Sequence, residues 1–178
     1  MTRRDYEVIE FIRDYKIAST DTIQQLFFPS LRVCQNRLKI LTEKGHLKRT
    51  RDSLNNQYVY YIKKPPLFRH SLLVTDFYRE MAKICKVEKF KLEPNLEKFR
   101  ADAAIGYVYN GKNHTILLEV EISHKGFDYK KYEGFNYSKF FPVKPKVIVV
   151  GDKVKPPPAN SNFVVLPTTL DGLRFVIR

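Results

Sequence analysis

The segment SLRVCQNRLKILTEKG, from Ser30 to Gly45, has an apolar pattern at helical spacing. Four apolar residues recur at intervals of three or four, which predicts one buried face of an α-helix. They are Leu31, Cys34, Leu38 and Leu41. Serine favours the position before a helix and glycine the position after one, so we expect the helix to lie between Ser30 and Gly45.

The other sides of this predicted helix are polar and mostly basic. They carry Arg32, Gln35, Asn36, Arg37 and Lys39. Arginine, glutamine and asparagine can form paired hydrogen bonds with base edges in the major groove of DNA. These five residues are therefore candidate DNA-contacting residues.

Two shorter helices are expected before this segment and a hairpin after it. Thr2 precedes one apolar stripe, and Ser19 or Thr20 can cap a second helix. The stretches HLKRTRDS and QYVYYIKK read as two strands around the turn LNN. The hairpin supplies three cations suited to phosphate contacts, Lys48, Arg49 and Arg51. Three helices and a basic hairpin predict an N-terminal winged helix-turn-helix domain over residues 1–64.

The chain has a formal net charge of +13, and the charge is concentrated. Residues 30–64 contain nine basic and two acidic side chains. This excess predicts a polyanionic partner, with a solvated basic face or a protein-interaction module as the alternatives. No apolar run approaches the roughly 20 residues of a membrane span, and two cysteines without CxxC spacing suit a reducing compartment. We expect a cytoplasmic protein that binds double-stranded DNA and no membrane.

The second half of the chain alternates between helical and strand patterns. The double proline in KKPP, residues 63–66, is a plausible boundary, so the second domain is expected over residues 67–178. A helix is expected over 71–86, then three strands, an amphipathic helix in FDYKKYEGFNYSKFF and a strand in KPKVIVVGD. NFVVLP and RFVIR are expected to be further strands. The predicted fold class is mixed α/β (α+β), with the order α-β-β-β-α-β.

Two of these strands, RADAAIGYVY and NHTILLEVEIS, are joined by Asn110-Gly111, a strong hairpin signal. A two-residue turn places Asp102 opposite Glu119 and Arg100 opposite Glu121, whereas a four-residue turn places Asp102 opposite Glu121. Three acids share one face in both registers. Their carboxylates are ligands that Mg²⁺ or Mn²⁺ prefers. The alternative is a solvated face balanced by nearby basic side chains.

This constellation resembles the PD-(D/E)XK nuclease-like fold, with an αβββαβ core, in which Asp102 of RADA and Glu119 of LEVE match the two acids. Glu121 stands where that family has its lysine, and Lys131 lies on the predicted following helix. The resemblance implies catalytic roles for these four residues and Mg²⁺ or Mn²⁺ as the cofactor if the domain is active. It also suggests lesser candidates, Glu80, Lys125 and Lys130. Independently of the resemblance, His124 lies just past the acids and is a lesser candidate as a ligand or base.

The winged-helix pattern together with RADA, LEVEIS and KKYEGF resembles the plasmid replication-relaxation family over nearly the whole chain. The resemblance implies a DNA-binding protein of a plasmid or other mobile element, acting in replication, transfer or transcription control, with an inactive or structural nuclease-like domain. The alternative is a metal-dependent DNA endonuclease, a nickase, targeted by the winged helix. The implied partners are double-stranded DNA, a second copy in a homodimer, and replication or mobilisation proteins.

Overall fold

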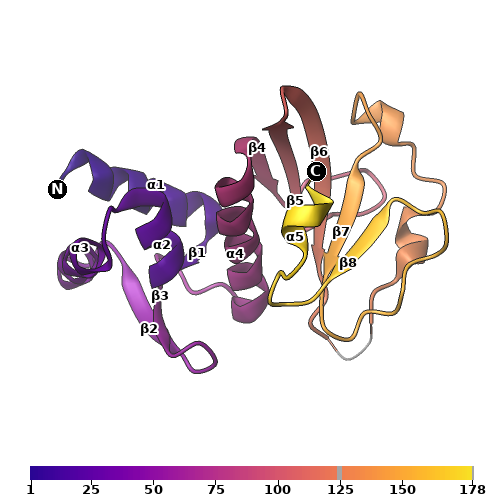
Figure 1. The fold of residues 1–178 in the computed structure, drawn as a ribbon. Helices are drawn as coiled ribbons and strands as arrows, with labels where there is room; N and C mark the ends of the chain where they lie inside the picture. Colours follow the sequence, from indigo (N-terminus) through magenta and orange to yellow (C-terminus); the bar gives the residue numbers. More distant parts are fainter. Residues whose placement is uncertain (124–125, 178) are drawn as a thin grey trace. The chain divides into compact units, whose positions relative to one another are not determined.

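The computed structural model describes residues 1–123 and 126–177 of the chain (Figure 1). It has a mixed α+β architecture with two separate sheets. The chain forms two compact units, Met1–Arg79 and Glu80–Arg178. The division falls within α4 (Phe68–Ile84), later than the proline-containing segment at which the sequence suggested a boundary.

Three helices open the first unit, α1 (Arg3–Tyr15), α2 (Thr20–Phe27) and α3 (Leu31–Glu43). Each is capped by the kind of residue that the sequence predicted. The Thr2, Ser19 and Ser30 hydroxyls accept hydrogen bonds from the backbone N–H groups three residues later. These bonds satisfy amides that a helix cannot pair internally.

The C-terminal end of α3 is fixed by Gly45, as expected. Gly45 has φ +75°, which a residue without a side chain adopts readily. The His46 N–H then donates to the Leu41 carbonyl at 2.9 Å, and the Gly45 N–H donates to the Thr42 carbonyl at 3.0 Å. This pair of bonds ends the helix and directs the chain into the hairpin.

A small antiparallel sheet completes the first unit, with the strand order β1 (Ile17–Ser19), β3 (Gln57–Tyr61), β2 (Lys48–Asp52). The predicted β2–β3 hairpin is confirmed, with Lys48 paired to Tyr61. The sequence did not predict β1, because three residues are too short to show an alternating pattern.

The core of this unit is built from the apolar stripes of its helices. Cys34, Leu38 and Leu41 are fully buried, as predicted. Burial also raises the pKa of the Cys34 thiol to about 12, so this cysteine is an inert packing residue. Leu31 was predicted to face inward, but it is the first residue of α3 and remains 48% exposed.

A buried ion pair joins α1 to α3. Asp5 is fully buried, and its carboxylate accepts hydrogen bonds from the Thr2 backbone N–H at 2.6 Å and from Arg37 Nε at 3.0 Å, while Arg37 Nη2 contacts its second oxygen. Burial opposes ionisation of Asp5, but the bonds from Arg37 and Thr2 outweigh it, so the pKa lies below the usual value. The ion pair therefore contributes its full stabilisation at pH values above the usual pKa of an aspartate. This contribution is lost as the pH falls through the lowered pKa of Asp5.

The second unit contains a five-stranded sheet with strands in sequence order. The strands are β4 (Lys86–Leu92), β5 (Ala103–Tyr109), β6 (Lys112–Val120), β7 (Lys146–Val150) and β8 (Phe163–Leu166). The first three are antiparallel, and β7 and β8 run parallel to β6. The two-residue turn is confirmed, because Tyr109 pairs with Lys112.

Two predictions for this unit are wrong. The segment after β6 does not form an amphipathic helix but two 3-10 turns, η1 (Tyr129–Tyr132) and η2 (Tyr137–Lys139). Gly134 lies between them with φ +64°, which interrupts helical geometry. RFVIR is not a strand, because Leu173–Val176 form the short helix α5.

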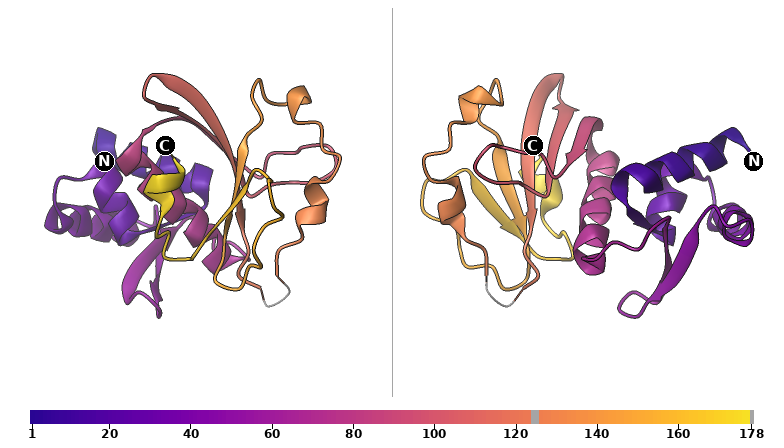
Figure 2. Two further views of the ribbon diagram at one scale, coloured as in Figure 1. Left: turned by 45° about the vertical axis from the view of Figure 1, so that its right-hand side comes forward. Right: turned by 180° about the vertical axis from the view of Figure 1, so that it is seen from behind.

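The segment from Phe127 to Phe141 instead covers one face of the sheet with aromatic rings. Leu117 and Val147, on adjacent strands, belong to one core cluster with Tyr132 and several phenylalanines. Figure 2 shows the two 3-10 turns on one face of the sheet and α5 on the other. Side chains alternate along a strand, so this aromatic cover determines which residues are buried beneath it.

The part of the chain that the structure describes contains no helix with both the length and the apolar character needed to cross a bilayer.

The Asp5–Arg37 pair gives a stability prediction. Asp5→Ala should lower the free energy of unfolding of the first unit by about 2–4 kcal/mol, because it removes a cap and leaves Arg37 without its partner. Native-state hydrogen exchange of the α1 and α3 amides reports this unit separately. The matched control is Glu7→Ala, which removes an exposed pair with Arg3 and should cost under about 0.5 kcal/mol. Equal protection in the two variants would contradict a structural role for Asp5.

Candidate functional site

The first candidate site is the polar stripe of α3. Four candidate residues recur at positions i, i+3, i+4 and i+7 and therefore lie on one side of the helix. They are Arg32, Gln35, Asn36 and Lys39, and all four are exposed. This stripe is opposite the buried one formed by Cys34, Leu38 and Leu41. Its side chains are available to a partner without any change in the core.

Arg37, the fifth candidate of this helix, has a different role. Its guanidinium is bonded to Asp5 on α1, and its side chain is only 27% exposed. It therefore positions α3 and is not displayed with the stripe. The sequence could not reveal this role, because Asp5 and Arg37 are 32 residues apart.

The β2–β3 hairpin holds the second group of candidates. Lys48, Arg49 and Arg51 are all exposed. Alternation along β2 puts Arg49 and Arg51 on one face, opposite Tyr60 and Tyr58 of β3. The Arg49 guanidinium lies 4.3 Å from the centre of the Tyr58 ring, a cation–π contact that holds the side chain along the strand.

Most of these cations lack an internal counter-ion. Within residues 1–123 and 126–177, Arg32, Lys48 and Arg51 form no ion pair with an acidic side chain, and Lys39 has only a 3.8 Å exposed contact with Glu43. Elsewhere in the same unit, cations such as Arg69 and Arg79 are paired with acids. Unpaired positive charge on α3 and β2 favours binding of an external polyanion.

The second candidate site surrounds Glu119 near the end of β6. The residue is only 4% exposed. Its Oε1 atom lies 2.8 Å from Lys131 Nζ and also accepts a hydrogen bond from the Tyr132 hydroxyl. Burial raises the pKa of Glu119 to about 7, and the Asp102 carboxylate adds to this rise while Lys131 and Tyr132 oppose it.

Asp102 lies next to Glu119 across the β5–β6 hairpin, as the two-residue turn predicted. Its backbone N–H donates to the Leu118 carbonyl at 3.0 Å, and its Oδ2 accepts from the Val120 N–H at 2.6 Å. Asp102 therefore ends the pairing of β5 and β6. Its charge contributes to the raised pKa of Glu119, so the two carboxylates share one electrostatic environment.

Lys131 is held against Glu119 by aromatic rings. Its ammonium lies between 5.3 and 5.6 Å from the ring centres of Phe99, Phe127 and Tyr132. Burial and the Glu119 carboxylate raise the pKa of the Tyr132 hydroxyl, which therefore acts as a hydrogen-bond donor. The sequence suggested Lys131 but missed Tyr132 and Phe99, because their role depends on how the aromatic segment folds over the sheet.

Glu121 is not part of the Glu119–Lys131 ion pair. It follows the end of β6, where its N–H donates to the Val150 carbonyl at 2.8 Å and its Oε1 accepts from the Ser123 N–H at 2.7 Å. Arg100, expected opposite Glu121, instead forms a bridge with Asn95. Two lesser candidates, His124 and Lys125, lie outside the described residues.

The sequence predicted a metal site formed by three carboxylates, those of Asp102, Glu119 and Glu121. Among the residues described, no three His, Cys, Asp or Glu side chains are grouped so that they could hold a metal ion. Asp102 and Glu119 remain as two hard oxygen donors, which suit Mg²⁺ or Mn²⁺ in their chemistry.

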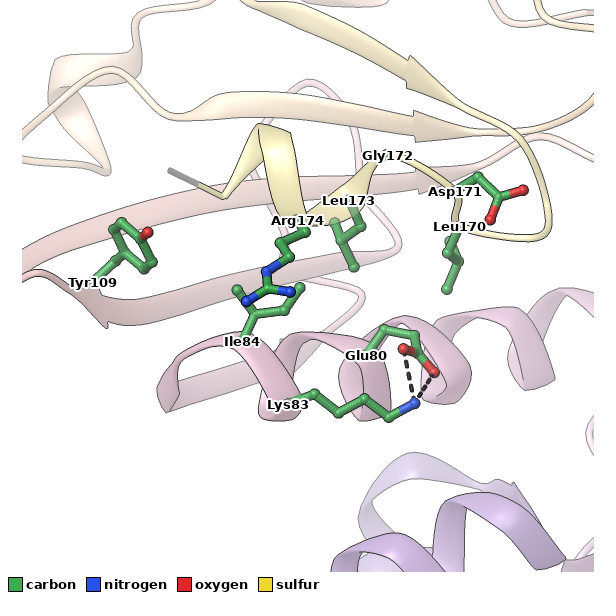
Figure 3. A pocket seen from close by; sticks show the side chains of 9 residues that line it. All are labelled: Glu80, Lys83, Ile84, Tyr109, Leu170, Asp171, Gly172, Leu173 and Arg174. Atoms are coloured by element: carbon green, nitrogen blue, oxygen red, sulfur yellow. Dashed lines mark hydrogen bonds and ion pairs between the residues drawn. The ribbon is translucent and has the colours of Figure 1, made fainter.

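Glu80, the candidate acid of the preceding helix, lies at a different place. It contacts Lys83 Nζ through both carboxylate oxygens, at 2.7 and 2.9 Å. Figure 3 shows this pair at the edge of a cavity of about 500 Å³, where the Arg174 side chain extends toward Ile84. The carboxylate of Glu80 is thus engaged by Lys83 on α4.

Comparison of the chain with protein-family models, curated proteins and solved structures found no match. The functional argument therefore rests on the residues and their geometry.

The raised pKa of Glu119 predicts how stability changes with pH. Between pH 4.5 and about 7, the folded chain binds a proton at this site that the unfolded chain has released, so stability should fall as the pH rises. The full effect is on the order of 3 kcal/mol. Glu119→Gln should flatten this slope in urea unfolding followed by circular dichroism in the presence of EDTA.

The matched control for this measurement is Glu97→Gln. Glu97 pairs with Lys139, but its side chain is 56% exposed. This substitution should leave the slope unchanged. If Glu119→Gln retained the wild-type slope, Glu119 would not be the buried titrating group.

Proposed function

We propose that the chain binds duplex DNA, with Met1–Arg79 acting as a winged helix that places α3 in the major groove. The observation that carries this proposal is the exposed stripe of Arg32, Gln35, Asn36 and Lys39, which lies opposite the buried face of its helix. The hairpin that follows adds Lys48, Arg49 and Arg51.

The chemistry of these side chains suits the two parts of a protein–DNA contact. Arg32, Gln35 and Asn36 can form paired hydrogen bonds with guanine or adenine edges. Leu31 and Val33 are 48% and 42% exposed at the start of the same helix, where they can contact thymine methyl groups. The hairpin cations suit phosphates, which position a protein on DNA without reading its sequence.

The proposed biological setting is a plasmid or other mobile element. The resemblance to the replication-relaxation family supports a role in replication, transfer or transcription control, with replication or mobilisation proteins as partners. A homodimer would let two copies of α3 read two half-sites. In this proposal, the second unit is an inactive or structural PD-(D/E)XK-like domain in which Lys131 and Tyr132 stabilise the buried Glu119.

A second candidate function is a metal-dependent DNA endonuclease. The observation that favours it is the contact of Lys131 with Glu119 beside Asp102, which supplies two acids and a lysine next to one another. Asp102 and Glu119 would hold Mg²⁺ or Mn²⁺, which when bound activates water for phosphodiester hydrolysis. Lys131 would favour the ionised form of Glu119, and Tyr132 would fix its orientation.

The DNA-binding proposal predicts two kinds of loss. Asn36→Ala should weaken binding to a sequence selected from random duplexes by about 1–3 kcal/mol. Lys48→Ala and Arg51→Ala should weaken binding to all duplexes, and each should reduce the slope of log affinity against log salt by about one. Fluorescence anisotropy at several salt concentrations measures both effects. Lys112→Ala is the matched control, since it removes an exposed cation from the second unit. Hairpin variants that behave like this control would contradict the proposed interface.

The nuclease candidate is tested with supercoiled plasmid. Metal-dependent nicking in Mg²⁺ or Mn²⁺ should be lost in Asp102→Asn and in Lys131→Met, while duplex binding is retained because neither residue lies on α3 or β2. Glu97→Gln is the control and should nick at the wild-type rate. Intact plasmid with wild-type protein in both metals would remove this candidate and leave DNA binding as the proposed function.

A further inference from the structure

The turn between β2 and β3 carries an exposed leucine that no core contact explains. Leu54 is 71% exposed and is flanked by Ser53, Asn55 and Asn56. Serine and asparagine are ordinary turn residues, because their side chains bond to nearby backbone groups. Leucine has no such advantage in a turn, and exposing it leaves its apolar surface in water.

This turn is held in place by a buried carboxylate. Asp52 is only 5% exposed. Its Oδ1 accepts from the Leu54 backbone N–H at 3.2 Å, and its Oδ2 accepts from Asn55 Nδ2 at 3.0 Å. Arg69 of α4 lies 3.4 Å from the same Oδ2. The leucine side chain is therefore presented by a backbone that is anchored to the rest of the unit, which lowers the entropic cost of placing it in a partner.

The charges around the turn indicate what kind of partner it meets. Arg51 is exposed, lies three residues before Leu54 and has no acidic partner in the described part of the chain. Arg49, one step further along the same face of β2, is held along the strand by its contact with Tyr58. These cations favour a polyanion over the apolar surface of another protein.

Apart from the thymine methyl groups in the major groove, duplex DNA offers an apolar surface between its stacked bases. Proteins that bind the minor groove insert leucine and similar side chains between base steps, and this kinks the duplex by about 20–90°. If α3 occupies the major groove, the adjacent hairpin crosses the backbone toward the neighbouring minor groove. The cations then meet phosphates and the tip of the turn meets base edges.

We propose that Leu54 is an intercalating wedge, which enters a base step from the minor groove and bends the bound DNA. This inference rests on the proposed DNA-binding function. It adds that the protein contacts the minor groove, that Leu54 makes this contact and that the bound DNA is bent. It also predicts preference for flexible pyrimidine–purine steps at the contacted position, because those steps unstack most easily.

The test compares affinity and bending on one duplex of about 25 base pairs, a length over which bends of this size can be measured. Dyes at the two ends report bending by energy transfer, and anisotropy reports affinity. Wild-type protein should shorten the end-to-end distance. Leu54→Ala should bind about tenfold more weakly, because the buried side chain is lost, and should leave the duplex straight. Leu54→Phe should restore the bend, since phenylalanine can also act as a wedge.

Leu67→Ala is the matched control. Leu67 is 64% exposed and precedes α4, outside the hairpin. It should bind and bend DNA as the wild type does. Melting temperatures of all variants should agree, because neither leucine is buried.

The outcomes separate the inference from the function on which it rests. Wild-type protein that binds the duplex without bending it, or Leu54→Ala protein that bends it fully, overturns the wedge and leaves DNA binding intact. Wild-type protein that ignores the duplex at low salt overturns both proposals.

Discussion

The ion pair between Asp5 and Arg37 is the contact on which the arrangement of the first unit depends. It joins the N-terminal cap of α1 to the middle of α3, and it is buried on the aspartate side. A charge in such a place is costly unless it is paired and hydrogen-bonded, so the pair admits few relative positions of the two helices. With α3 held in this way, Gln35 and Asn36 point away from the core.

Much of the fold was predictable where the determining signal is local. The two ends of α3 could be predicted from Ser30 and Gly45, because helix capping involves residues within a few positions of the helix ends. The Asn110-Gly111 turn gave the β5–β6 register, and with it the closeness of Asp102 and Glu119. The exposure of Arg32 and Lys48 could also be predicted, because it requires only that these side chains lie on the polar side of their helix or strand.

The remaining features depend on contacts that a linear pattern does not contain. In the sequence, Arg37 does not differ from the other basic residues of its helix, and only the fold brings it against Asp5. Tyr132 is one of many aromatic residues in its segment, and only the fold places its hydroxyl on Glu119. The segment between β6 and β7 has enough apolar residues for a helix, but Gly134 and ring packing against Leu117 favour two short turns. The difference between Glu119, which pairs with Lys131, and Arg51, which has no acidic partner among the described residues, likewise depends on contacts between residues distant in sequence.

The most direct test of the central claim is an amide chemical-shift titration of the ¹⁵N-labelled chain with a duplex at low salt. The account predicts shifts concentrated in residues 31–39 of α3 and in residues 48–58 of the hairpin, with small changes in the strands of the second unit. Shifts confined to the second unit, or a spectrum that does not change, would contradict the assignment of α3 and the hairpin as the DNA-binding surface.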